Sequence, residues 1–242
     1  MRNDFMSGFR NVMLPALALA LVMLPSPGTA TAQEAQAAPP GGQLHLSIPG
    51  TFVRVVYNDE GYVVLGYATA NASVGQEWML LEIGLTTQQK VQATVHRDGI
   101  AVITPDGQTV PLATQQEYNA AGGKLRSLNA RANIQRQSIN YFPAWSKNPC
   151  RVGFFSDTSQ NARMMTYDQI SLDWRRACVG RLYFHLPEKI QYGQYYLQVK
   201  FPHSTIKVPF RIMTKEELKK AKAKLKEMQK EAKAKAKADK KK

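Results

Sequence analysis

Strict alternation of apolar and polar residues dominates the chain before residue 213. It covers three stretches, 181–186, 195–201 and 206–212, with turn sequences at 191–193 and 202–204 between them. Because successive side chains leave a strand on opposite faces, each stretch offers one apolar face to a core and one face to water. We therefore predict three consecutive strands that form one half-exposed antiparallel sheet and require a second layer.

Shorter segments earlier in the chain predict further strands. Residues 52–57 and 62–69 flank a turn sequence and indicate a hairpin, whereas Trp78 to Leu85 is apolar on both faces and indicates a central, doubly covered strand. Three short segments between residues 91 and 112 predict a meander, with Pro111 marking an edge strand. Many short strands with frequent turns are typical of an all-β sandwich.

Two capping boxes predict helices. Thr114 and Glu117 open a stretch with helical spacing, so we expect a helix near 114–137 that Gly122 and Gly123 weaken and can split. Thr214 and Glu217 open a second helix over 214–242, which we expect to fray toward its lysine-rich end.

One run carries a resemblance to a known fold. Residues 193–199 (GQYYLQV) resemble the tyrosine corner of immunoglobulin-like domains, with Tyr195 as the tyrosine and Leu197 at the core position two residues later. Trp78 resembles the buried tryptophan of that fold, although neither cysteine matches the usual inter-sheet positions and Gln191 replaces a common acidic residue. The resemblance implies an all-β, immunoglobulin-like antiparallel β-sandwich over 43–213, with a helical insertion and a C-terminal basic α-helix.

The N-terminus predicts export. Arg2 and Arg10 flank an apolar run of residues 12–24, and Ala30-Thr31-Ala32 is typical of a signal-peptidase site. We interpret 1–32 as a signal peptide and 33–42 as a flexible linker, because the run is shorter than the roughly 20 residues that cross a bilayer. The expected location is secreted or periplasmic, with no membrane span after cleavage.

Two cysteines, Cys150 and Cys178, follow the predicted signal peptide. In an oxidising compartment two cysteines usually pair, so we predict a disulfide. A metal site or a nucleophile is the alternative, but no C-x-x-C and no histidine at ligand spacing accompanies either cysteine. We predict no metal and no cofactor.

Signatures of catalysis are absent from the sequence. None of the four histidines sits in a metal-ligand motif, and there is no G-x-S-x-G, phosphate loop or G-x-G-x-x-G. His185 falls on the polar face of its predicted strand, which indicates a solvated histidine. The sequence does not decide whether a catalytic pair of carboxylates is present, because two such residues can be far apart in sequence and meet only in the folded chain.

An aromatic and arginine-rich region provides the candidate ligand site. Aromatic rings and guanidinium groups together bind glycans or anions by stacking and bidentate hydrogen bonds. The alternative is that the rings cover one end of the sandwich while the arginines are solvated. The candidate residues are Tyr141, Trp145, Arg151, Arg163, Arg175 and Arg176.

The charge lies at the end of the chain. The formal net charge is +14, and residues 214–242 hold 13 lysines against five acidic residues. Such a tail favours anionic partners, although it could also serve only as a solubilising appendage. The candidate anion-binding residues are Lys219, Lys222, Lys226, Lys230, Lys233, Lys235, Lys237, Lys240, Lys241 and Lys242.

Two functional hypotheses follow. The first is a non-catalytic binding or structural module whose tail associates with an anionic envelope component or acidic polymer, with a possible protein partner through the tail helix. The second is a secreted enzyme that acts on glycans, with its site in region 141–181. The missing catalytic motifs favour the first.

Overall fold

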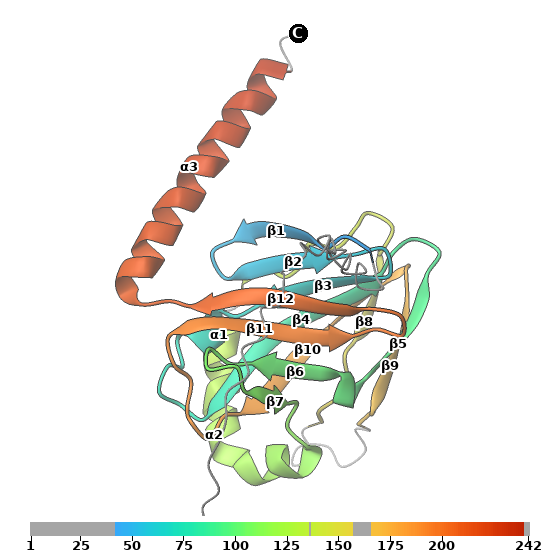
Figure 1. The fold of residues 1–242 in the computed structure, drawn as a ribbon, viewed down its shortest axis with the longest axis vertical. Helices are drawn as coiled ribbons and strands as arrows, with labels where there is room; N and C mark the ends of the chain where they lie inside the picture. Colours follow the sequence, from blue (N-terminus) through green and yellow to red (C-terminus); the bar gives the residue numbers. More distant parts are fainter. Residues whose placement is uncertain (1–41, 136, 157–165, 240–242) are drawn as a thin grey trace, which may run out of the picture. The chain divides into compact units, whose positions relative to one another are not determined.

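The computed structural model describes residues 42–135, 137–156 and 166–239. The predicted signal peptide, all but the last residue of the predicted linker, and Arg163 lie outside the described residues. Within them, strands in several sheets predominate over a few helices (Figure 1). The predicted all-β class is confirmed.

The larger sheet has six strands, and all its pairings are antiparallel except that of β8 with β10. At its centre β4 pairs with β10 from Trp78–His185 to Leu85–Cys178, and every residue of β4 is buried. The prediction of a doubly covered strand at Trp78 is therefore confirmed. In spatial order the strands are β1 (His45–Gly50), β2 (Val53–Tyr57), β3 (Gly61–Gly66), β4 (Trp78–Thr87), β10 (Arg176–His185) and β8 (Asn148–Arg151).

Two smaller sheets complete the strands. The four-stranded sheet ends at β7, so the prediction of an edge strand at Pro111 is confirmed. In spatial order its strands are β12 (Thr205–Ile212), β11 (Gly193–Lys200), β6 (Ile100–Ile103) and β7 (Thr109–Pro111). The two-stranded sheet pairs β5 (Gln92–His96) with β9 (Gln169–Asp173).

Two sequence predictions of pairing are wrong. The stretches 181–186 and 195–212 do not share a sheet, because β10 joins the six-stranded sheet while β11 and β12 join the four-stranded one. The alternation predicted that the second face of β10 is exposed to water. Tyr183 on that face is only 4% exposed, because the helix that follows β7 covers it. Similarly, β5 pairs with the distant β9 instead of continuing a meander into β6.

The core lies between the six-stranded and four-stranded sheets. Leu81 and Ile83 of β4 and Leu197 of β11 are fully buried in it, and β12 packs against β2 and β3. At the start of β11 the hydroxyl of Tyr195 accepts a hydrogen bond from Gln191 N (3.0 Å) and donates one to Gln191 O (3.1 Å).

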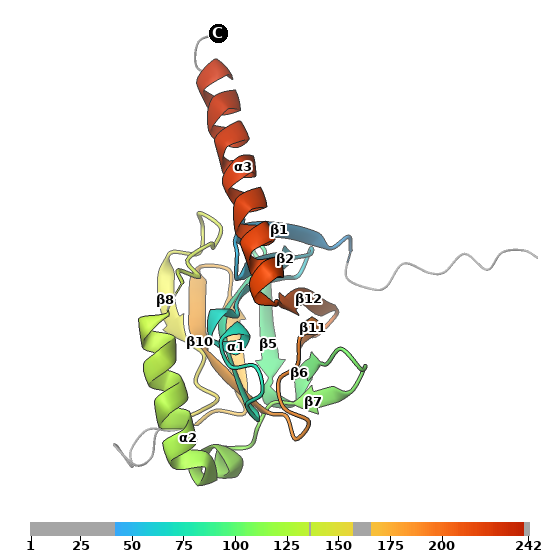
Figure 2. The same cartoon turned by 90° about the vertical axis from the view of Figure 1, so that its left-hand side faces the viewer.

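Two short helices, α1 (Ala68–Asn71) and the 3₁₀ turn η1 (Arg97–Gly99), accompany the longer helix α2 (Gln115–Ile134). The predicted capping box of α2 is present, since Thr114 and Glu117 bond each other's backbone N–H. Gly122 has φ 30° and ψ −98°, so the helix kinks where the glycine pair weakens it. The part of α2 that follows this kink lies on the face of β10 that points away from the four-stranded sheet (Figure 2).

Helix α3 (Lys215–Asp239) follows β12 directly. Thr214 N donates to Glu217 Oε2 (2.9 Å) and Glu217 N donates to Thr214 Oγ1 (3.2 Å), which confirms the second capping box. Leu218 and Ala221 pack against the core, and Glu217 also pairs with Arg211. Beyond these first turns, no α3 side chain that the structure describes is buried. None of the described helices combines the length and apolarity needed to cross a bilayer.

The predicted disulfide is present. Cys150 of β8 faces Cys178 of β10 across the parallel pair, with a Cα–Cα distance of 4.3 Å. Cys178 is fully buried, so the bond fixes the edge strand β8 to its neighbour β10.

We predict that Leu197→Ala lowers the free energy of unfolding by about 2–5 kcal/mol, because it leaves a cavity between the two sheets. Chemical denaturation measures the change. Lys207→Ala, at an exposed position of the neighbouring β12, is the control and should change the value by less than about 0.5 kcal/mol. A comparable loss in both variants would contradict the core assignment.

We predict that the chain isolated from an oxidising compartment contains no free thiol until it is reduced, after which two thiols titrate under denaturing conditions. The bond closes a separation of 28 residues, so replacing both cysteines by alanine should cost about 3–4 kcal/mol on the chain-entropy model. Two free thiols in the unreduced protein would contradict the prediction.

Candidate functional site

The segment between α2 and β8 places Tyr141 and Trp145 at one end of the larger sheet. Tyr141 is exposed, and its carbonyl accepts a hydrogen bond from Tyr62 Oη (2.9 Å). Next to Trp145, Ser146 Oγ lies 2.9 Å from Thr86 Oγ1 and donates to Trp174 O (2.7 Å). These bonds tie the segment to the end of β4 and to the turn between β9 and β10.

Trp145 is half-buried, and its indole Nε1 has no hydrogen-bond partner among the described residues. Phe154 and Phe155, which follow β8, are buried. Most aromatic rings of this region are therefore at least partly buried, and only Tyr141 of the two candidate aromatics is exposed.

The candidate arginines lie on different surfaces. Arg175 stacks its guanidinium over Trp174, with its Cζ 4.7 Å from the ring centroid, and Arg176 is exposed at the start of β10. Arg151 is exposed on the edge strand β8, three positions further along the parallel pairing. The structure thus brings Trp145, Arg175 and Arg176 to one end of the sheet and leaves Arg151 apart from them.

Arg176 also lines an open, shallow groove of about 500 Å³ beside the β5–β9 pair. Polar side chains dominate it, and Asp173 is the one carboxylate among the described lining residues. Such a mixture can hydrogen-bond a polar ligand. The lining residues are Gln92, Ala93, Thr94, Ser171, Leu172, Asp173, Arg176 and Pro202.

A buried polar network that the sequence did not reveal lies at the same end. Glu60 is 8% exposed, and its carboxylate accepts hydrogen bonds from Ser204 Oγ (2.6 Å) and from His203 N (3.1 Å). Asn58 Nδ2 donates to Ser204 Oγ (2.9 Å), while Asn58 Oδ1 accepts from Gly61 N (2.7 Å). The network joins the β2–β3 turn to the β11–β12 turn.

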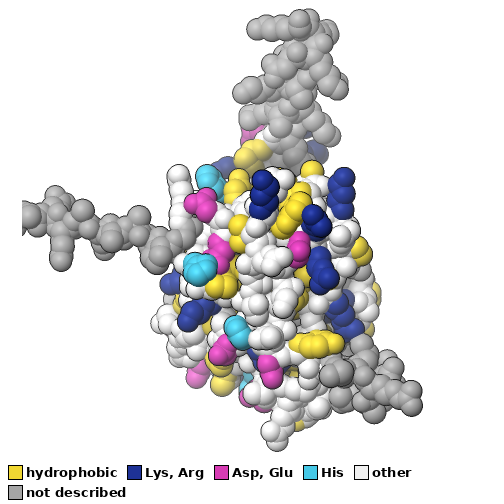
Figure 3. Space-filling model, turned by 90° about the vertical axis from the view of Figure 1, so that its right-hand side faces the viewer, with side chains coloured by type: hydrophobic (Ala, Val, Ile, Leu, Met, Phe, Trp, Pro, Cys, Tyr) yellow, Lys and Arg dark blue, Asp and Glu magenta, His cyan; other side chains and the backbone are white. Residues whose placement is uncertain are grey.

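Local sequence could explain only half of that network. A turn residue such as Asn58 commonly bonds its own backbone, which accounts for the contacts within the β2–β3 turn. The contact of Glu60 with Ser204 spans 144 positions of sequence, so no short-range signal could have found it. Figure 3 shows that acidic, basic and histidine side chains are interspersed over this end of the molecule.

A second cluster lies beneath α2. Tyr118, Phe155 and Tyr183 meet edge to face or tilted, with ring centroids 4.9–5.1 Å apart. Tyr183 Oη donates to Asn129 Oδ1 (2.6 Å), and burial raises the pKa of Tyr183 well above its ordinary value. Arg97 stacks on Phe155, with its Cζ 4.5 Å from the centroid. This arrangement packs α2 onto β10.

Arg97 has no freedom to act on a ligand. Its guanidinium donates to the carbonyl oxygens of Phe154 and Ala113, and burial lowers its pKa. Arg181 likewise donates to Asn129 Oδ1 (3.1 Å) and Asn133 Oδ1 (2.6 Å) of α2. Arg97 therefore holds the segments before α2 and after β8 in place, and Arg181 holds α2 on β10.

The histidines show no metal centre within the described part of the chain, where no group of three or more potential ligands clusters. His45 stacks on Tyr57 with ring centroids 5.0 Å apart. His185 is partly exposed, and its ring stacks on that of Trp78 with the centroids 5.0 Å apart, so it is solvated on one side only. The alternation placed it correctly on the outer face of β10, where Trp78 of β4 also lies.

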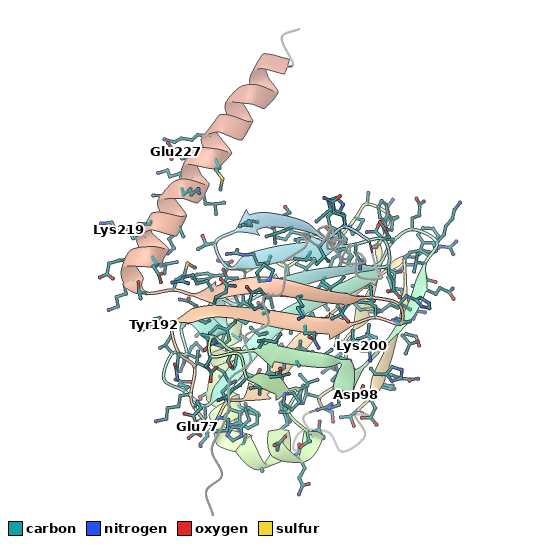
Figure 4. The ribbon with its side chains drawn as sticks, in the orientation of Figure 1. Glu77, Asp98, Tyr192, Lys200, Lys219 and Glu227 are labelled. Carbon is teal, nitrogen blue, oxygen red and sulfur yellow. A yellow bond between two sulfur atoms is a disulfide. The ribbon has the colours of Figure 1, made fainter. Side chains whose placement is uncertain are left out.

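The lysines of α3 form a second candidate site. Lys215, Lys219, Lys222, Lys226 and Lys230 recur three or four positions apart and so share one face of the helix, which we call the lysine stripe. All five are exposed, and none lies within ion-pair distance of a carboxylate in the described residues. Figure 4 shows Lys219 and Glu227 projecting from α3 into solvent. The candidates from Lys233 to Lys237 belong to the same helix, and Lys240, Lys241 and Lys242 lie outside the described residues.

Comparison with known proteins returned no match: no family model fits the chain, and no similar curated protein or solved structure was found.

We predict that Ser204→Ala lowers the free energy of unfolding by about 1–3 kcal/mol, because Glu60 and Asn58 each lose a buried hydrogen-bond partner. Ser47→Ala, at an exposed position of β1, is the matched control. Urea denaturation of the two variants checks the difference, and equal stability would show that the network contributes nothing.

Proposed function

We propose that this chain is an exported, non-catalytic binding module whose lysine-rich helix α3 associates with anionic surfaces or polymers. The lysine stripe is the observation that carries the proposal. Its five ammonium groups are exposed on one face and have no described carboxylate partner. Such an array attracts phosphate or carboxylate groups spaced along a surface.

The helix itself supports this interpretation. Like charges four positions apart, such as Lys215–Lys219 and Lys222–Lys226, destabilise an isolated helix. An anionic partner removes that repulsion, so binding and helix formation favour each other. The capping box at Thr214 and the contact of Leu218 with the core hold the first turn in place without a partner.

The disulfide supports the exported location, because such bonds persist mainly in oxidising compartments. The interpretation of the sandwich as immunoglobulin-like belongs to the same proposal. It draws support from the hydrogen bonds of Tyr195 with Gln191 and from the burial of Trp78 and Leu197.

The alternative of a glycan-processing enzyme would use the groove beside Arg176. Glycoside hydrolysis ordinarily needs two carboxyl groups, one on each side of the scissile bond. Asp173 is the single carboxylate among the described groove residues, so the geometry favours binding over hydrolysis.

We predict that the triple variant Lys219→Gln, Lys222→Gln and Lys226→Gln elutes from heparin at clearly lower salt than the parent chain. The matched control replaces Lys147, Lys200 and Lys207 by glutamine, which removes the same charge from exposed positions of the sandwich. Because the attraction is screened by salt, the two variants should differ most at low ionic strength.

Thermal midpoints should be the same in all three proteins, since every replaced lysine is exposed. Deletion of residues 232–242 should also weaken retention without unfolding the domain. Identical elution of the stripe variant and the parent chain, or an equal shift in the control, would refute the proposed function.

A further inference from the structure

Strand β1 exposes aliphatic side chains in strict alternation. Leu44, just before the strand, is 48% exposed, and Leu46 and Ile48 within it are 51% and 46% exposed. The other large apolar side chains exposed in the described residues stand singly, on helices, loops or single strand positions. We call Leu44, Leu46 and Ile48 the β1 apolar strip.

The position of β1 in the sandwich explains this exposure. Leu46 lies opposite Val56, whose side chain faces the core between the two sheets. Leu46 therefore lies on the inner side of the larger sheet, and the pairing of β1 with β2 shifts register between Ser47 and Gly50, next to Ile48. However, β12, the edge strand of the four-stranded sheet, packs against β2 and β3, so β1 extends past the layer that covers its neighbours. Exposed apolar side chains on an edge strand invite association, and contiguous ones mark interaction surfaces.

The lysine-rich helix begins at the same edge of the sandwich. Strand β12 packs on β2, the partner of β1, and α3 starts three residues after β12 ends at Ile212. Figures 1 and 2 both show β1 and α3 on the same side of the sandwich.

We propose that the β1 apolar strip and the lysine stripe form one docking surface for an anionic phospholipid bilayer. The aliphatic side chains enter the interfacial region of the bilayer, and the ammonium groups contact the headgroup phosphates. This inference rests on the proposed function and narrows the partner to a membrane surface. The reason is that a dissolved polyanion would satisfy the lysines but would leave the strip in water.

The two features fit together energetically. A lone apolar anchor or a lone basic patch binds a bilayer weakly and reversibly, whereas the two combined give stable attachment. The charge has the required sign, since the chain carries a formal net charge of +14. Attachment of this kind needs no helix that crosses the bilayer.

The test is co-sedimentation of the exported chain with phosphatidylcholine–phosphatidylglycerol vesicles and with pure phosphatidylcholine vesicles. The variant Leu44→Ser, Leu46→Ser and Ile48→Ser should lose roughly tenfold or more of its partitioning to the anionic vesicles. At raised salt the parent chain should retain some binding through the strip, while this variant should retain none. Its elution from heparin should match that of the parent chain.

Ile134→Ser, at an 85% exposed position of α2, is the matched control and should bind vesicles like the parent chain. Equal vesicle binding by the strip variant and the parent chain would overturn the inference and leave the tail function intact. A parallel fall in heparin and vesicle binding would also overturn it, because the substitutions would then act through the helix or the fold. Failure of the proposed function is a separate outcome, seen when the lysine-stripe variant elutes unchanged from heparin.

Discussion

The pairing of β4 with β10 is the constraint on which the rest of the fold depends. These two strands are neighbours in the interior of the larger sheet, and Leu81, Ile83 and Phe184 bury their inner faces against the four-stranded sheet. Their outer faces hold Trp78 and Tyr183, and exposing these large side chains to water would cost free energy. A second covering layer is therefore required. Helix α2 supplies it through Asn129 and Tyr118, together with Phe155 from the segment after β8.

Several cations and polar groups serve that covering layer. Arg97 and Arg181 use their guanidinium groups to hold loop carbonyls and α2 amides, and the disulfide fixes β8 against β10. Glu60 also joins two turns that are far apart in sequence. These groups are engaged in contacts within the fold. Among the described residues, the exposed edge at β1, the groove beside Arg176 and the lysines of α3 are surfaces that a partner can reach.

The candidate sites differ in how far sequence could define them. The lysine stripe follows from helical spacing alone, because Thr214 and Glu217 fix the start of the helix and hence the face on which each lysine lies. The aromatic and arginine region was found as a segment, but its residues separate in space. Trp145 is half-buried, Arg175 stacks on Trp174, and Arg151 lies on an edge strand. The groove combines β5 and β9 with Pro202, which no local pattern could bring together.

The sequence by itself determined most of the strands, though not β8 or the short helix α1, together with the capped helix starts, the break at Gly122 and the pairing of two cysteines. Each of these depends on residues close in sequence, or on there being only one possible partner. Only the tertiary structure decided which strands share a sheet, because alternation defines the faces of β10 and β5 but not their neighbours. It also decided which apolar faces remain uncovered. Leu46 and Leu197 both lie on alternating strands. Leu197 is buried because β11 lies between β12 and β6 and faces the core, whereas Leu46 is exposed because β1 extends past the opposite sheet.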